Sequence, residues 1–344
     1  MKSQQRLRWL SAVAGLGLAI GAGHAAAQKT QLNVYTALET DQIKAYEAAF
    51  NKVYPDVELK FTRDSTGVIT AKVLAEKANP QADIVIGTSA SSMAVFANEG
   101  MLEPYAPKGL DKIPAGYRDS QNPPRWVGMD VYGAALCFNT VEAQKQNLPK
   151  PESWKDLTKP VYKGKIVMPN PASSGTGFLD VSGWIQMWGE ADAWKFMDGL
   201  HENVAQYMHS GSRPCAAAAA GEYVVGISFE YRANREKARG APIDLVFPKE
   251  GLGWDLEATG IMKNTQKLDA AKKLADWAIS DDAMKIYANN YAITAVTSHS
   301  KQLPNLPADY ASKLAKNDFA WAASNRQKIL AEWSKRYDSK SAPK

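Results

Sequence analysis

The chain has 344 residues, of which 45% are hydrophobic and 22% are charged, and its formal net charge is +5. Residues 1–27 hold three basic and no acidic residues, so the remainder carries a charge near +2, which argues against a nucleic-acid-binding protein with its strongly basic face. The length beyond residue 27 exceeds what one hydrophobic core usually holds, so two lobes are expected.

The first residues resemble an export signal. Residues 2–8 are basic, residues 10–22 form an apolar run, and Ala25 to Ala27 supply the small side chains that a signal peptidase needs. We expect cleavage near Ala27 and release into the periplasm. No cysteine lies at the cleavage site, so no lipid anchor is expected. No later stretch approaches the roughly 20 apolar residues of a membrane span.

Strands and helices alternate over the next hundred residues. Predicted strands at 32–35, 57–61 and 83–86 are each followed by apolar residues at helical spacing. This alternation predicts a mostly parallel sheet, whose ligands usually lie beyond the carboxyl ends of the strands. We therefore expect four polar residues at the same edge of this sheet, beyond the carboxyl ends of its strands: Thr36, Glu39, Thr88 and Ser89.

The stretch from 101 to 124 is rich in proline, glycine and polar residues, which indicates a connection between lobes. A strand is expected at 131–138. Later strands are expected at 223–228, 243–247 and 254–262, and most of the chain after residue 268 has helical patterns.

Residues 165–177 combine a strand, a turn and a helix start. Lys165 to Met168 has the composition of a buried strand, and Pro169 and Pro171 prevent it from continuing. Ser173, Ser174, Gly175 and Thr176 then precede a helical pattern that begins at Phe178. Free backbone amides at a helix start can bind an anion. The alternative is that Ser173 or Ser174 is an ordinary helix cap. Ser210 to Pro214 repeats the pattern of hydroxyls and glycine before a helix.

Only two cysteines are present, Cys137 and Cys215. In an oxidising compartment they can pair and constrain the unfolded chain. The alternative is two small buried thiols.

Motifs of catalysis and metal binding are absent from the sequence. Beyond residue 27 the only histidines are His201, His209 and His299, and no HExxH, CxxC pair, GxSxG or phosphate-binding GxxxxGK[ST] occurs. Serine-rich loops without an evident base suit ligand binding better than nucleophilic attack. We expect a protein that is not an enzyme and that holds no cofactor or metal.

Four runs of sequence carry a family resemblance: LNVYTALETDQ, ADIVIGTSASS, PNPASSGTG and FEYRANREKARGAPIDLVFPKEG. With them the chain resembles the class II periplasmic solute-binding proteins of ABC importers, most closely the 2-aminoethylphosphonate-binding branch related to ferric-ion-binding proteins. The resemblance implies an α/β fold of two lobes joined by a hinge, each a mostly parallel sheet flanked by helices. It also implies a monomer that delivers its ligand to a permease in the inner membrane.

The expected division places 28–125 plus 250–300 in lobe 1 and 126–249 in lobe 2. Residues 301–344 are expected to form helices that pack on lobe 2.

The chemistry of the loops favours a zwitterion with a tetrahedral anion. Ser173, Ser174, Gly175 and Thr176 would donate hydrogen bonds to a phosphonate. Arg213 is a candidate second partner of the same group. Glu39, with Asp255 or Glu230, is a candidate to bind the ammonium group. Further polar contacts to the ligand are expected from four residues: Tyr35, Thr36, Ser89 and Tyr231.

Two other functions remain open. Ferric-ion-binding relatives use adjacent tyrosines where this chain has Glu230 and Tyr231, although Tyr231, Glu39 and Glu230 could offer oxygen ligands to iron. A secreted enzyme that acts on a phosphoester or phosphonate is the second alternative.

Overall fold

The computed structural model describes residues 29–290 and 292–343, and the predicted export signal lies outside them. The strands are β1 (Thr30–Thr36), β2 (Val57–Arg63), β3 (Ile84–Ser89), β4 (Val127–Asn139), β5 (Ile166–Pro169), β6 (Val204–Met208), β7 (Val225–Phe229), β8 (Ile243–Val246), β9 (Trp254–Ile261) and β10 (Ile293–Thr294). The α-helices are α1 (Thr40–Val53), α2 (Thr66–Ala75), α3 (Ala90–Asn98), α4 (Thr140–Lys145), α5 (Gly175–Trp188), α6 (Glu190–Asn203), α7 (Arg213–Ala219), α8 (Glu230–Ala238), α9 (Leu268–Ala278), α10 (Asp281–Asn289), α11 (Tyr310–Lys313) and α12 (Phe319–Tyr337).

The strands follow the order β2-β1-β3-β9-β4-β7-β5-β6, and β8 and β10 both pair with β4. β1 is parallel to β2 and β3, and β5 is parallel to β6 and β7, as the alternating pattern predicted. β9 and β4 instead run antiparallel to their neighbours. The sheet is therefore mixed, with parallel strands at both ends and two antiparallel strands in the middle.

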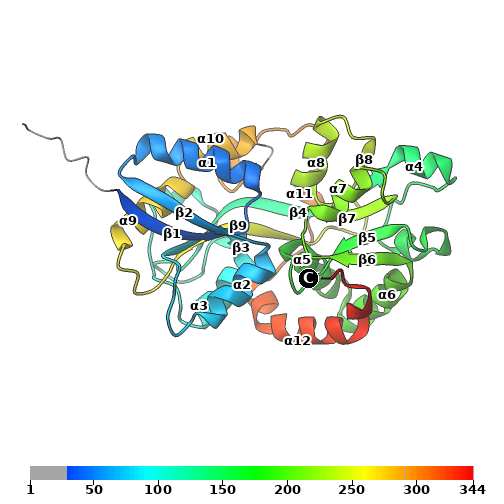
Figure 1. Ribbon diagram of the computed structural model, residues 1–344, viewed down its shortest axis with the longest axis horizontal. Coiled ribbons are helices and arrows are strands. Elements are labelled where there is room, and N and C mark those ends of the chain that lie inside the picture. Colours follow the sequence, from blue (N-terminus) through cyan, green and yellow to red (C-terminus); the bar gives the residue numbers. More distant parts are fainter. Residues whose placement is uncertain (1–28, 291, 344) are drawn as a thin grey trace, which may run out of the picture.

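The two-lobed α/β architecture is confirmed (Figure 1). One lobe packs α1, α9 and α10 over β1 and β3, and its core contains Phe50, Trp277 and Tyr287. The other lobe has a core that includes Trp154 and Trp184. Each lobe thus buries large aromatic rings of its own, which stabilises it as a folding unit.

β4 joins the lobes. All thirteen of its residues are buried. Its first half pairs with β9, and its second half pairs with β7 and β8. Gly128 and Asp130 interrupt the apolar residues of its first half, which explains why the sequence predicted this strand only from residue 131.

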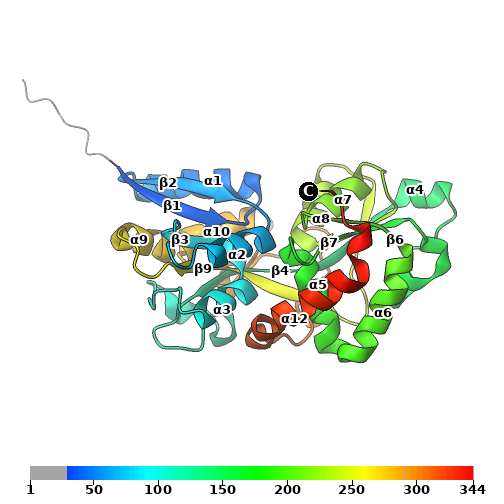
Figure 2. The ribbon, with the colours of Figure 1, turned by 60° about the horizontal axis from the view of Figure 1, so that its bottom comes forward.

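Helix α12 contacts both lobes (Figure 2). At its start, the ring of Phe319 packs edge-on against Trp126 and Trp254. Near its end, Trp333 packs against Tyr207 of β6. The helix is therefore not confined to lobe 2. The residue boundaries of the two lobes remain a proposal.

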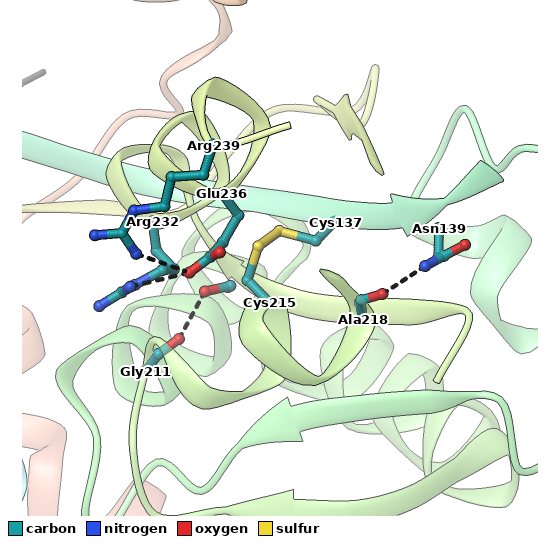
Figure 3. The surroundings of a disulfide bond; sticks show 9 residues. Cys137, Asn139, Gly211, Cys215, Ala218, Arg232, Glu236 and Arg239 are labelled. Carbon is teal, nitrogen blue, oxygen red and sulfur yellow. Dashed lines mark hydrogen bonds and ion pairs between the residues drawn. A yellow bond between two sulfur atoms is a disulfide. The ribbon is translucent and has the colours of Figure 1, made fainter. Parts of the chain in front are cut away.

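Cys137 of β4 and Cys215 of α7 form a disulfide (Figure 3), which decides between the two alternatives that the sequence left open. Their Cα atoms lie 5.3 Å apart and 78 residues separate them in the chain. The bond fixes the start of α7 to the central strand, directly after the loop that contains Ser210 and Gly211.

No helix within residues 29–290 and 292–343 combines the length and the hydrophobicity needed to cross a membrane.

Candidate functional site

A cleft with a cavity of about 40 Å³ lies where the two lobes meet. Its lining comes from strand ends, helix starts and the two central strands. The lining residues are Ala37, Glu39, Arg63, Ser65, Thr66, Gly87, Ser89, Tyr132, Ser174, Gly175, Thr176, Ser210, Gly211, Phe229 and Glu257. Five residues predicted from the sequence are among them: Glu39, Ser89, Ser174, Gly175 and Thr176.

One part of the cleft consists of hydroxyl groups and helix starts. Ser174 caps α5, because its Oγ accepts a hydrogen bond from the Gly177 amide at 3.3 Å. The same residue lines the cleft, so the cap and the proposed anion contact do not exclude each other. Thr66, at the start of α2, approaches α5 closely: a Cβ placed on Gly175 would lie 2.7 Å from Thr66 Oγ1. Two helix starts thus meet here, where their amides favour an anion.

Arg63 supplies a positive charge to the cleft, and it is not among the residues predicted from the sequence. It ends β2, next to Thr36 of β1 in the parallel register. Its Nε donates a hydrogen bond to the Leu38 carbonyl at 3.0 Å, and its Nη2 lies 3.9 Å from Glu39 Oε1. The rule that ligands lie beyond the carboxyl ends of parallel strands, applied to β2, would have found it.

Glu257 is an acid in the cleft, and it too is not among the residues predicted from the sequence. It pairs in register with Ser89 of β3 and with Asp130 of β4. Burial raises the pKa of Asp130 to about 7 and raises that of Glu257 well above its usual value. Two neighbouring carboxyl groups in a poorly solvated place resist ionising together.

Glu39 lines the cleft but already has a cationic partner. Its Oε2 accepts a hydrogen bond from Arg232 Nη2 at 2.7 Å, and both side chains are 14% exposed. Arg232 belongs to α8 of the other lobe, so this ion pair joins the lobes. A ligand ammonium group would have to share Glu39 with a guanidinium.

Three predicted residues of lobe 1 and the central strands lie outside the lining. The Tyr35 hydroxyl donates to Glu76 Oε2 at 3.0 Å, and Thr36 Oγ1 accepts from the Leu38 amide at 3.1 Å. Asp255 Oδ1 accepts from the Leu256 amide at 2.7 Å, and burial raises its pKa to about 6.

Four predicted residues of lobe 2 also lie outside the lining. The Ser173 hydroxyl donates to the His209 carbonyl at 3.0 Å. The side chain of Arg213 is 59% exposed and lies 3.5 Å from Glu222. Glu230 Oε2 accepts from the Gly133 amide at 2.7 Å, and burial raises the pKa of Glu230 to about 8. Tyr231 stacks on Phe229, and burial raises the pKa of its phenol.

Two of the three side chains considered as iron ligands have other partners, whereas the Tyr231 hydroxyl is buried without a hydrogen-bond partner among the described residues. Glu39 is paired with Arg232, and one oxygen of Glu230 is bound by a backbone amide. Across the residues that the structure describes, no group of three or more His, Cys, Asp or Glu side chains could hold a metal ion.

Known proteins resemble this chain over most of its length. The family of bacterial extracellular solute-binding proteins matches residues 79–322. The periplasmic binding protein AfuA of Actinobacillus pleuropneumoniae, solved with fructose-6-phosphate bound, is 30% identical with a TM-score of 0.84, over 90% of this chain and 99% of that one.

Two relatives by sequence extend the comparison. A Haemophilus influenzae protein is 34% identical over 328 residues, which is 94% of each chain. The Sinorhizobium fredii protein named "Probable ABC transporter periplasmic-binding protein y4fP" is 27% identical over 73% of this chain and 68% of its own. The family and these relatives support solute binding in transport rather than catalysis. The chain is the periplasmic solute-binding component of an ABC transporter, and it belongs to the family of bacterial extracellular solute-binding proteins.

Proposed function

We propose that the cleft binds 2-aminoethylphosphonate, or a close aminophosphonate, and that the protein presents it as a monomer to a permease of the inner membrane. The observation that carries this proposal is the composition of the lining. Hydroxyls, helix-start amides and Arg63 suit an anion, while Glu257 and Glu39 suit a cation, and both kinds of group line one small cavity.

The anionic group of the ligand would be bound by the start of α5 together with Thr66 and Arg63. Ser174 and Thr176 offer hydroxyls, Gly175 offers an amide without a side chain in the way, and Arg63 offers charge. Hydrogen bonds from such donors to an ionised oxygen are stronger than neutral ones. A tetrahedral dianion has enough acceptors to use several of them at once.

The size of the cavity favours a small ligand. At about 40 Å³ it accommodates few heavy atoms unless the lobes open further. 2-Aminoethylphosphonate carries its two charged groups on a two-carbon chain, so both can reach opposite kinds of lining group within a short distance.

A phosphorylated sugar is the second candidate, and the likeness to AfuA with bound fructose-6-phosphate favours it. A sugar phosphate would use the same anion-binding groups. It would not need the carboxyl groups to meet a positive charge, and it would need a larger cavity.

Titration calorimetry distinguishes these ligands. We expect micromolar or tighter binding of 2-aminoethylphosphonate, which corresponds to about 8 kcal/mol or more. Binding of phosphate, phosphonoacetate and ethanolamine should be much weaker, because each lacks one of the two charged groups or carries the wrong one. Absence of heat with 2-aminoethylphosphonate, or equal affinity for plain phosphate, would refute the ligand assignment. Tight binding of fructose-6-phosphate alone would establish the second candidate.

Substitutions at the start of α5 test the anion contacts. Ser174→Ala and Thr176→Ala should each weaken binding by roughly 1–3 kcal/mol, because each leaves a charged partner short of a donor. Ser173→Ala is the matched control, since the Ser173 hydroxyl bonds to His209 instead of facing the cleft, and its affinity should not change. Unchanged affinity in Ser174→Ala and Thr176→Ala would remove this helix start from the site.

A further inference from the structure

Three polar side chains lie in a row across the floor of the cleft. Ser89 of β3, Glu257 of β9 and Asp130 of β4 are direct partners in the antiparallel register. Directly paired residues point to the same face of a sheet, with Cβ atoms about 5 Å apart. Ser89 and Glu257 line the cavity, and Asp130, which is 2% exposed, lies immediately behind Glu257. The row therefore leads from the cleft into the protein.

The two acids of this row have unused hydrogen-bonding capacity. Oδ2 of Asp130 and Oε2 of Glu257 are buried, and the described residues offer them no hydrogen-bond partner other than the neighbouring acid. A buried acceptor that lacks a donor costs free energy, so such atoms usually indicate a missing partner. Because Glu257 reaches the cavity, a ligand can supply that partner.

The arginines nearest the cleft have partners other than the pair. Arg232 is bound to Glu39 and Glu236, and Arg63 donates to the Leu38 carbonyl and lies 3.9 Å from Glu39. The other titratable groups whose charges act on the pair are Glu39 directly before α1, Tyr46 of α1, Tyr132 of β4, Glu230 and Tyr231 of α8, and Tyr287 of α10. All are acids or phenols, so their ionised forms only increase the negative potential.

We infer that the Asp130–Glu257 carboxyl pair is the ammonium-binding subsite of the cleft, and that the entering ammonium group displaces the proton that the pair holds when the cleft is empty. This inference rests on the proposed function. The raised pKa values of both groups support it, since they keep a proton on the pair near neutral pH.

The exchange balances in charge and atoms. In the free protein one proton lies between the two carboxyl groups. The ligand brings R–NH₃⁺, which keeps its three protons and donates hydrogen bonds to carboxylate oxygens. The displaced proton goes to the solvent, so the net reaction is protein–H⁺ plus ligand giving protein–ligand plus H⁺. Affinity for an aminophosphonate should therefore rise with pH across the titration range of the pair.

The ligand's own phosphonate also titrates, since a phosphate-type group loses its second proton near pH 6. Because the ammonium group lowers the pKa of the phosphonate beside it, ethylphosphonate, which has no amine, does not match this effect. The effect is the same for two proteins that bind the same ligand, so the proton release that belongs to the carboxyl pair is the difference between the wild type and Glu257→Gln with 2-aminoethylphosphonate.

The test is calorimetry of 2-aminoethylphosphonate and ethylphosphonate in two non-phosphate buffers of different protonation enthalpy. With 2-aminoethylphosphonate, the wild type should release more protons than Glu257→Gln does. Glu257→Gln should bind 2-aminoethylphosphonate about tenfold to hundredfold more weakly, the usual effect of losing a charged hydrogen bond, and should lose the extra proton release. Its affinity for ethylphosphonate should change less than about twofold.

Asp180→Asn is the matched control. Asp180 is fully buried with both carboxyl oxygens unpartnered, and burial raises its pKa well above the usual value, but it lies outside the lining. Its affinity and proton release should equal those of the wild type. Asp130→Asn, which removes the acid behind the cleft, should resemble Glu257→Gln in proton release.

The outcomes separate the two proposals. If the wild type gives no heat with 2-aminoethylphosphonate, the proposed function fails and the inference fails with it. If the wild type binds but Glu257→Gln binds equally well, with equal proton release, only the carboxyl subsite is overturned. Thermal unfolding of each variant establishes that weaker binding does not come from a misfolded protein.

Discussion

At the scale of single residues, Arg63 and Arg213 differ in their position relative to the cleft, and a measurement of ligand affinity can show this difference. Arg63 lines the cleft, whereas Arg213 is largely exposed and interacts with Glu222 at 3.5 Å. Arg63→Met should weaken phosphonate binding by roughly 1–3 kcal/mol, because a charged donor to the anion is lost. Arg213→Met should leave the affinity unchanged within twofold. Calorimetry measures the affinity of both variants. A larger loss of affinity in Arg213→Met than in Arg63→Met would mean that Arg213 belongs to the site.

Glu230 gives a prediction about pH and stability. Burial raises its folded-state pKa to about 8, while an unfolded chain would have a pKa of about 4.3. Between these values the folded state keeps a proton that the unfolded state has lost, so the free energy of unfolding falls as pH rises. Each pH unit in this window costs about 1.4 kcal/mol for one such group.

The measurement is the melting temperature of unliganded protein from pH 5 to pH 8. The wild type should lose stability across this range, and Glu230→Gln should lose less. Glu190→Gln is a suitable control, because Glu190 is exposed, and its hydrogen bond with Lys328 lowers its pKa below this window. If the Glu230→Gln profile runs parallel to that of the wild type, Glu230 is already ionised in the folded protein.

The sequence allowed only part of the lining to be predicted at this scale. Ser174, Gly175 and Thr176 were identified because a helix start is a local feature. Glu257 was not, because its neighbours in the row, Ser89 and Asp130, come from strands far apart in the chain. Tyr35 and Arg213 were candidates for their chemistry, yet each has an acidic partner, Glu76 and Glu222, that the sequence alone does not show.

At the scale of elements, the contact between α2 and the loop before α5 depends on a glycine. The Gly67 amide donates to the Ser173 carbonyl at 2.9 Å, across the gap between the lobes. A Cβ on Gly67 would overlap the Ala172 carbonyl oxygen and lie 2.7 Å from the Ser173 carbonyl carbon. These are backbone atoms, so they cannot move aside by a side-chain rotation.

Gly67→Ala should therefore hinder closure without unfolding either lobe. Alanine is about 1 kcal/mol better than glycine inside a helix, so α2 itself gains stability. We expect weaker ligand binding and a larger radius of gyration by X-ray scattering in the presence of ligand. Gly116→Ala is the control, because a Cβ there meets no atom within 4 Å. If Gly67→Ala has the affinity and the radius of gyration of the wild type, closure of the lobes does not depend on the close contact between α2 and the loop before α5.

Most elements could be predicted from apolar spacing, and the exceptions have local reasons. α7 was expected because Pro214 suits a helix start before a run of alanines. β6 was not expected, since Val204–Met208 mixes polar and apolar residues and follows α6 directly. It is a strand because β5 pairs with it and Trp333 of α12 covers Tyr207. Such tertiary contacts leave no signature in five residues of sequence.

At the scale of the whole molecule, two lobes were predictable from length, but the way they are joined was not. The antiparallel course of β4 and β9 through the middle of the sheet depends on which strand pairs with which, over separations of more than a hundred residues. The position of α12 across both lobes likewise follows from Phe319 and Trp333 each finding aromatic partners in different lobes.

Ion pairs between α1 and α8 hold the lobes together in this structure. Glu39 is bound to Arg232, and Asp41 is bound to Arg235 and lies 3.9 Å from Arg239. Arg232 and Arg239 also converge on Glu236 of their own helix, which orients them (Figure 3). Because the pairs form only when the lobes approach, they favour the closed arrangement even without ligand.

Arg232→Met should shift the unliganded protein toward an open arrangement while keeping the apolar stem of the side chain. The expected result is a larger radius of gyration by X-ray scattering without ligand, and little difference at saturating ligand, because the ligand can still draw the lobes together. Ligand affinity should fall in proportion to the lost closed population.

Arg336→Met is the control, because Arg336 also forms ion pairs, with Glu332 and Asp198, but these do not cross the cleft. Partly exposed pairs weaken with salt, so a high ionic strength should open the wild type and should affect Arg232→Met less, because only the pairs of Asp41 remain in that variant. Identical scattering of Arg232→Met and the wild type at low salt would mean that these ion pairs do not control closure.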